Sequence, residues 1–255
     1  MVQINDPRIV YAMGVLSRNL DMDFYPFGSV YHKDNPNDLD IAVAGNTTKT
    51  AIVHVHDTVK AIAECAITSQ KSAKLYRVLN NPHDTKYISC HKFQCPGDQL
   101  LPVNLLMCDN IPWIQGASMT KPTPGIHHSN KHAIMLQSAI TTAKGKQHGE
   151  EWYLRNNGIF QCVVLTKGLY NIKTITTDIT RVPEVWGLDS DHRVLNCLGE
   201  MLQLLSEKAD PQFVRMVLHE YSHHYAHYVY ENTSVIEDIL KQIINGIPYF
   251  SPTNV

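Results

Sequence analysis

The stretch from Phe27 to Val43 reads "FGSVYHKDNPNDLDIAV", and it decides the fold class of the first half of the chain. A Gly-Ser pair follows an aromatic residue, and a polar loop then leads to Asp38 and Asp40, which alternate with aliphatic residues. Side chains two residues apart in a β-strand lie on the same face. The two aspartates should therefore lie together at the start of a strand, while their aliphatic neighbours point toward a core.

This spacing favours a metal and phosphate site. Two carboxylates held so close repel each other, and a divalent cation such as Mg²⁺ makes the pair favourable. Upstream, Gly28 permits a close backbone approach, and Ser29 offers a hydroxyl and an amide to phosphate oxygens. Together these features predict a phosphoryl-transfer site. The alternative is a surface hairpin whose acidic turn binds nothing, because Asn, Pro and Asp are common turn residues.

The flanking segments predict an α+β domain. Asp6 followed by Pro7 and a helical apolar pattern predicts a capped amphipathic helix. Residues 51–57, "AIVHVHD", could form a short strand, while residues 58–70, "TVKAIAECAITSQ", have helical spacing. Two further strands are expected at Tyr87–Cys95 and Leu101–Cys108, joined by a turn.

The second half of the chain is expected to be mainly helical. Residues 109–128 are rich in Pro and Gly and predict a boundary loop or linker. A hairpin is expected within residues 158–177. The helices expected in this half are Ser129–Asn156, Arg193–Lys208, Pro211 to Tyr230 and Val235–Ile247.

The bulk composition is that of a globular protein. Of 255 residues, 44% are apolar and 18% are charged, which argues against long disorder. The formal net charge of −2 gives no general electrostatic reason to bind nucleic acid or a membrane surface. The sequence shows no signal peptide and no apolar run near the roughly 20 residues of a membrane helix. We therefore expect a soluble, cytoplasmic protein with no membrane partner. The six cysteines form no Cys-x-x-Cys pair, so we expect them to be free thiols.

The opening stretch resembles the signature of the polymerase-beta-like nucleotidyltransferase superfamily, in which Gly-Ser follows a strand and a loop leads to Asp-x-Asp flanked by aliphatic residues. The resemblance spans about the first 110 residues, which is a usual domain size. It implies an α+β fold with a small mixed-sheet catalytic core, assigned to a domain at 1–125. A mainly helical region at 126–255 would then help to bind the acceptor.

The resemblance also implies a reaction and the roles of four residues. By position, Asp38 and Asp40 would bind two Mg²⁺ or Mn²⁺ ions that activate a nucleoside triphosphate, and Gly28 and Ser29 would hold its phosphates. A nucleoside monophosphate would pass to an acceptor hydroxyl as pyrophosphate leaves. RNA, a protein and a small molecule all stay open as the acceptor.

Two features depart from the family pattern, and the first is the loop from Ser29 to Asp38, which is slightly short for the family. The second is the identity of one residue. The family commonly has a third carboxylate on a later strand, and the expected strand "PVNLLMC" carries Asn104 there. An asparagine offers a neutral oxygen and cannot act as a base. Asp109, at the end of that strand, is the alternative third ligand. The departure supports another hypothesis, a catalytically degenerate nucleotidyltransferase fold that acts as a binding protein.

A histidine-rich segment supports an alternative of a different class. The sequence "HEYSH" matches the H-E-x-x-H pattern of zinc peptidases, in which His219 and His223 would bind Zn²⁺ and Glu220 would act on a bound water. In a nucleotidyltransferase, the same helix could instead contact a base or an acceptor phosphate. The other candidates for zinc ligands are His227, Glu231 and Glu237. Five more side chains could contact a triphosphate or an acceptor: Lys131, His132, Lys144, Lys146 and Arg155. The alternative for each is a position on a solvated helix face.

Overall fold

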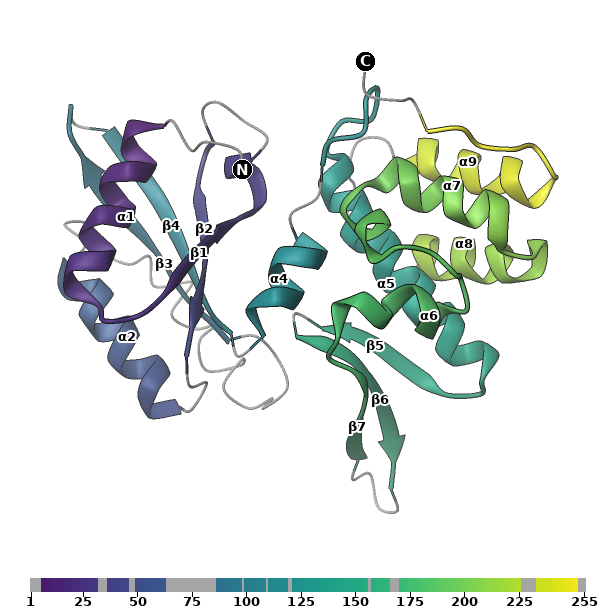
Figure 1. Ribbon diagram of the computed structural model, residues 1–255, viewed down its shortest axis with the longest axis horizontal. Helices are drawn as coiled ribbons and strands as arrows, with labels where there is room; N and C mark the ends of the chain where they lie inside the picture. Colours follow the sequence, from purple (N-terminus) through teal and green to yellow (C-terminus); the bar gives the residue numbers. More distant parts are fainter. Residues whose placement is uncertain are drawn as a thin grey trace. The chain divides into compact units, whose positions relative to one another are not determined.

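The computed structural model of the chain describes residues 6–31, 36–45, 49–62, 86–97, 99–108, 110–118, 121–155, 157–165, 170–225 and 233–251. The chain forms two compact units, Met1–Gln115 and Gly116–Val255. Each unit contains a β-sheet together with helices, so the α+β class is confirmed (Figure 1). Among the residues described, no helix is long and apolar enough to cross a membrane.

The first unit is built around a small mixed sheet. Its described strands have the order β1-β2-β4-β3, in which β2 and β4 are parallel and the two outer pairs are antiparallel. The predicted strands of this unit are confirmed, whereas the strand alternative for residues 51–57 is wrong because they lie in a helix. The elements are α1 (Pro7–Asn19), β1 (Phe24–Phe27), the 3₁₀ helix η1 (Gly28–Tyr31), β2 (Leu39–Ala44), α2 (Lys49–Ile62), β3 (Lys86–Cys95) and β4 (Gln99–Cys108). Helix α4 (Ile111–Ser118) begins in this unit and ends in the second.

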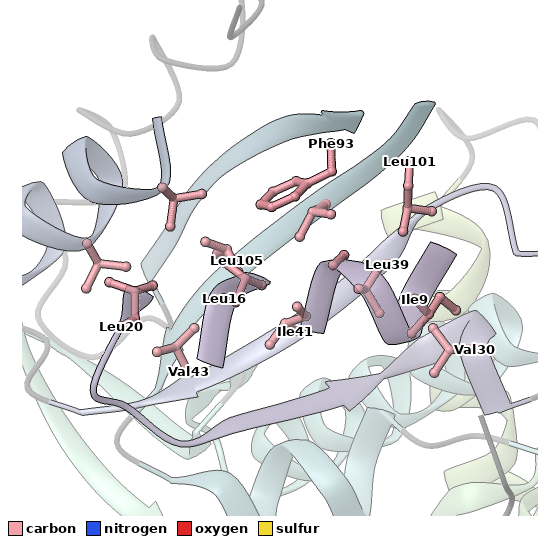
Figure 2. Packing of buried hydrophobic residues seen from close by; sticks show 14 of the residues in the cluster. Ile9, Leu16, Leu20, Val30, Leu39, Ile41, Val43, Phe93, Leu101 and Leu105 are labelled. Atoms are coloured by element: carbon pink, nitrogen blue, oxygen red, sulfur yellow. The ribbon is translucent and has the colours of Figure 1, made fainter. Parts of the chain in front are cut away.

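Helix α1 begins as predicted and covers one face of this sheet. Asp6 is its N-cap and accepts a hydrogen bond from the backbone N–H of Arg8 at 2.9 Å, while Pro7 occupies the first turn. The buried face of the helix includes Ile9 and Leu16, which pack on the core side of the sheet (Figure 2). A capped start and an apolar stripe are local signals, so the sequence was sufficient to predict this helix.

The two faces of the sheet have different neighbours. In β2, Leu39, Ile41 and Val43 are buried in the core with α1 and α2, as Figure 2 shows. Ala42 alternates with them and belongs to a second cluster that includes Ile114 of α4. The residues of β4 that share the first core are Leu101, Val103, Leu105 and Met107.

Helix α4 corrects the prediction of a linker at 109–128. Its backbone is capped by Asn110, whose Oδ1 accepts a hydrogen bond from the N–H of Trp113 at 3.3 Å. Ile114 and Trp113 are buried, and this apolar content stabilises a helix despite the prolines and glycines around it. Pro112 is tolerated because it lies in the first turn, where a backbone N–H has no intrahelical partner.

The second unit combines helices with an antiparallel sheet of order β5-β6-β7. The hairpin predicted within residues 158–177 is confirmed as β6 and β7. Helix α5 packs against α8, and α8 packs against α9. The described elements are α5 (Ser129–Gln147), β5 (Glu151–Arg155), β6 (Gly158–Val164), β7 (Tyr170–Thr176), η3 (Ile179–Arg181), α6 (Val182–Trp186), η4 (His192–Asn196), α7 (Leu198–Lys208), α8 (Pro211–Tyr225) and α9 (Thr233–Ile244).

The helix predicted at Ser129–Asn156 is too long. It ends at Gln147, because Gly149 adopts a left-handed conformation with φ +71° and the chain turns back. The strand β5 then places Trp152 against the helix, and an ideal Cβ at Gly145 would lie 2.7 Å from the Cγ of that tryptophan. Packing on a helical glycine is a tertiary contact, which the periodicity of this segment does not reveal.

The later helices differ from the prediction at their ends. The helix expected at Arg193–Lys208 is two elements, η4 and α7, because Cys197 between them is extended, with φ −142° and ψ 121°. Helix α8 begins at Pro211 as predicted, and residues 226–232 lie outside the described part of the chain. Helix α9 ends at Ile244, shortly before Gly246, whose φ is +77°.

Candidate functional site

Asp40 and Asn104 lie side by side on the two central strands of the first sheet. Strands β2 and β4 are parallel, and their register pairs these two residues directly. Ile41 and Leu105, the next residue on each strand, are buried in the core below the sheet. Because side chains alternate along a strand, Asp40 and Asn104 point to the opposite face. Asp38 precedes β2 by one residue and lies on the same side as Asp40.

The side chain of Asn104 bridges the two predicted carboxylates. Its Nδ2 donates hydrogen bonds to Asp38 Oδ2 at 3.2 Å and to Asp40 Oδ1 at 2.8 Å. Ionised carboxylates only accept hydrogen bonds, so the nitrogen end of the amide is the end that faces them. Asn104 is buried, whereas both aspartates are half-buried. The predicted pair therefore converges on a single atom, and Asn104 lies at the centre of the site.

The Gly28-Ser29 turn lies directly against this pair. Gly28 has φ +76°, and an ideal Cβ on it would lie 3.0 Å from Asp40 Oδ2. A side chain here would be strained and would crowd the carboxylate, so glycine is required for two reasons. The Oγ of Ser29 is buried and has no hydrogen-bond partner among the described residues. Such a hydroxyl is unfavourable unless a ligand or a water satisfies it.

Arg8 belongs to the surroundings of this site, although the sequence did not single it out. Its Nη2 donates to the carbonyl of Pro36 at 3.1 Å, two residues before Asp38, and to Asp6 Oδ2 at 2.6 Å. The hydrogen bonds from the Arg8 side chain lower the pKa of Asp6 below its ordinary value. Arg8 thus connects the start of α1 to the chain that enters β2. Only the Asp6 contact had a local sequence signal, a charged pair at a helix start.

The described donors fit a divalent cation in part. Asp38 and Asp40 supply convergent carboxylate oxygens, which Mg²⁺ and Mn²⁺ prefer. No three His, Cys, Asp or Glu side chains within the described residues gather in a way that could hold a metal. A cation at this pair would therefore need further ligands from water and from phosphate oxygens, as Mg²⁺ usually has in nucleotide sites. Asp109, the alternative third ligand, lies outside the described residues.

The histidines and the glutamate of the motif on α8 have different surroundings. The rings of His219 and His223 stack on an exposed face, with centroids 5.8 Å apart. The Glu220 carboxylate is buried instead, and its Oε1 forms an ion pair with Lys146 Nζ at 2.6 Å. That oxygen is 4.0 Å from the His219 Nε2. A catalytic glutamate needs access to a metal-bound water, so this geometry does not favour the peptidase hypothesis.

The other candidates of the second unit have structural contacts. Glu237 accepts a hydrogen bond from Ser222 at 2.7 Å, which joins α9 to α8, while His227 and Glu231 lie outside the described residues. His132 is fully buried, and its Nδ1 lies 2.6 Å from the Tyr221 hydroxyl. Lys144 lies near the Phe213 ring, Arg155 lies over the Tyr153 ring, and Lys131 is exposed on α5.

Comparisons of the sequence with protein-family models and with curated proteins find no match. A functional assignment therefore depends on the geometry of Asp38, Asp40, Asn104 and the Gly28-Ser29 turn.

Proposed function

We propose that the first unit is a nucleotidyltransferase, which transfers a nucleoside monophosphate from a nucleoside triphosphate to an acceptor hydroxyl. The observation that carries the proposal is the convergence of Asp38 and Asp40 beside the Gly28-Ser29 turn, on the face of the sheet opposite the core. The buried hydroxyl of Ser29 adds a donor that has no described partner. The mixed sheet and the polymerase-beta-like sequence pattern support the same assignment.

Each residue of the site has a role in this reaction. The Gly28-Ser29 turn would bind phosphate oxygens through backbone N–H groups and the Ser29 hydroxyl. Asp38 and Asp40 would hold Mg²⁺ or Mn²⁺ against the same phosphates. The cation, when bound, would stabilise negative charge on the phosphates and on the leaving group. Asn104 keeps the two carboxylates together, because its amide donates a hydrogen bond to each.

The transfer is an in-line displacement at the α-phosphorus. The oxygen of the acceptor hydroxyl forms a new bond to this phosphorus, and the bond to the oxygen that bridges the α- and β-phosphates breaks. Pyrophosphate leaves with the bonding electron pair, and the hydroxyl proton passes to water. The site would place the attacking and leaving oxygens in line, which is the main contribution of a protein to phosphoryl transfer.

The test is transfer of a radioactive label. The protein is incubated with each α-³²P nucleoside triphosphate, Mg²⁺ or Mn²⁺ and a cell extract that supplies acceptors. We expect the label on one class of acceptor, and we expect Asp38→Ala and Asp40→Ala to abolish the transfer while their circular dichroism spectra match the wild type. Asp57→Ala, at an exposed position on α2, is the matched control and should retain transfer. Transfer by a folded double variant of Asp38 and Asp40 would contradict the proposal.

A second candidate is a binding protein that uses the same site without catalysis. Asn104 favours it, because an amide lies where a third carboxylate could otherwise assist the acceptor hydroxyl. This candidate predicts that nucleotide binding depends on a divalent cation and on Asp40, but that no label reaches any acceptor.

RNA, a protein and a small molecule stay possible acceptors, and the labelled product identifies which one is used.

A further inference from the structure

We propose that Asn104 fills the place of a second cation, so that the carboxylate pair holds one divalent ion and not two. This inference rests on the proposed function and specifies its metal requirement. It makes Asn104 a positioning residue, which acts through Asp38 and Asp40 and does not touch the phosphates itself.

The two carboxylate oxygens of Asp40 face different neighbours. Oδ1 accepts the hydrogen bond from Asn104 Nδ2 at 2.8 Å, which directs it toward β4. Oδ2 faces the phosphate-binding turn, because an ideal Cβ at Gly28 would lie 3.0 Å from it. The β4 side of the pair is therefore filled by an amide group. The inferred cation would therefore lie on the side of the Gly28-Ser29 turn, in contact with a carboxylate and a phosphate.

The amide compensates part of the negative charge of the two carboxylates, as a cation in this position would. Its two N–H groups carry partial positive charge and reach both Asp38 and Asp40, which reduces the repulsion between them. A second cation would have to displace both hydrogen bonds. It would then have two carboxylates for its ligands and not three, and the number of charged ligands is a main determinant of cation affinity.

The closest test counts metal ions by native mass spectrometry. The probe is Mn²⁺ with inorganic tripolyphosphate, which carries the phosphates of a nucleotide and needs no choice of base. The wild-type complex with one tripolyphosphate should contain one Mn²⁺. Asn104→Asp restores a third carboxylate and should contain two. Asn171→Asp is the matched control, because it adds the same charge at an exposed position of the second unit, and it should contain one.

A thermal shift measurement supplies a second readout. Three adjacent carboxylates repel one another, so Asn104→Asp should have a lower Tm than the wild type without metal, and Mn²⁺ should raise its Tm by more. A wild-type complex with two Mn²⁺ ions overturns the inference and leaves the proposed function in place. An unchanged count of one in a folded Asn104→Asp also overturns it. No tripolyphosphate complex in any variant overturns both proposals.

Discussion

A comparison of Gly28→Ala with Gly97→Ala separates the effect of backbone strain from the effect of crowding the Asp40 carboxylate. Gly28 has φ +76°, and the new Cβ would lie 3.0 Å from Asp40 Oδ2, so one of the two groups must shift by a few tenths of an ångström. Gly97, in the turn between β3 and β4, is the matched control. Its φ is +78°, but an added Cβ there would have no neighbour within 4 Å.

Both variants should lose stability. A left-handed conformation disfavours a residue with a Cβ by about 1–2 kcal/mol, and both positions carry this conformation. Urea unfolding should therefore give a free energy of unfolding that is lower than the wild type by about this amount in Gly97→Ala, and lower by at least this amount in Gly28→Ala, where the Cβ also crowds Asp40. Only Gly28→Ala moves a proposed metal ligand, so only it should bind the Mn²⁺ complex of tripolyphosphate more weakly.

Isothermal titration calorimetry measures that difference. We expect at least about a tenfold increase in Kd for Gly28→Ala, equivalent to about 1.4 kcal/mol, and no change beyond error for Gly97→Ala. Equal affinities in two folded variants would refute the reasoning, because the turn would then not be part of the binding site.

Three further predictions concern stability. Asp6→Asn keeps a hydrogen-bond acceptor at the N-cap but removes its charge, and we expect it to lose about 1 kcal/mol of stability at neutral pH. Since folding lowers the pKa of Asp6, the difference in free energy of unfolding between the variant and the wild type should shrink as the pH falls below the ordinary pKa of 3.8, and a difference in urea unfolding that does not change with pH would contradict this. Lys146→Met breaks an ion pair to a buried glutamate and should lower the free energy of unfolding by about 2 kcal/mol, less than for a fully buried pair because the lysine is half exposed. Lys241→Met breaks an exposed ion pair and should have no measurable effect, so equal losses in the two variants would contradict a larger contribution from the buried glutamate. Gly145→Ala should lower Tm despite the higher helix propensity of alanine, because the Cβ would overlap Trp152 with a penalty of about 1–3 kcal/mol; a higher Tm would show that the contact relaxes freely.

Local signals were sufficient for part of the fold. Asp6 and Pro7 mark the start of α1 through capping and a fixed backbone angle, and both effects act within one helical turn. The alternation around Asp38 and Asp40 predicted the start of β2, because Leu39 and Ile41 are buried in the core while Asp40 between them is only half-buried. The sequence also drew attention to Asn104, which the structure pairs with Asp40.

Long-range contacts were not predictable in the same way. The register that brings Asp40 beside Asn104 depends on pairing between distant segments, and no local pattern sets it. The hydrogen bond from Arg8 to Pro36 and the packing of Trp152 on Gly145 have the same character. The burial of Glu220 is a further case, since the H-E-x-x-H spacing does not specify which side chain faces the core.

In the proposed function, Asp38, Asp40 and the Gly28-Ser29 turn form one metal and phosphate site. The most direct measurement is anomalous diffraction at a wavelength sensitive to manganese, from crystals grown with Mn²⁺ and tripolyphosphate. We expect one manganese peak in contact with both carboxylates, on the side of Gly28, with phosphate density at the turn. Phosphate and manganese bound elsewhere, with no peak at the two aspartates, would contradict it.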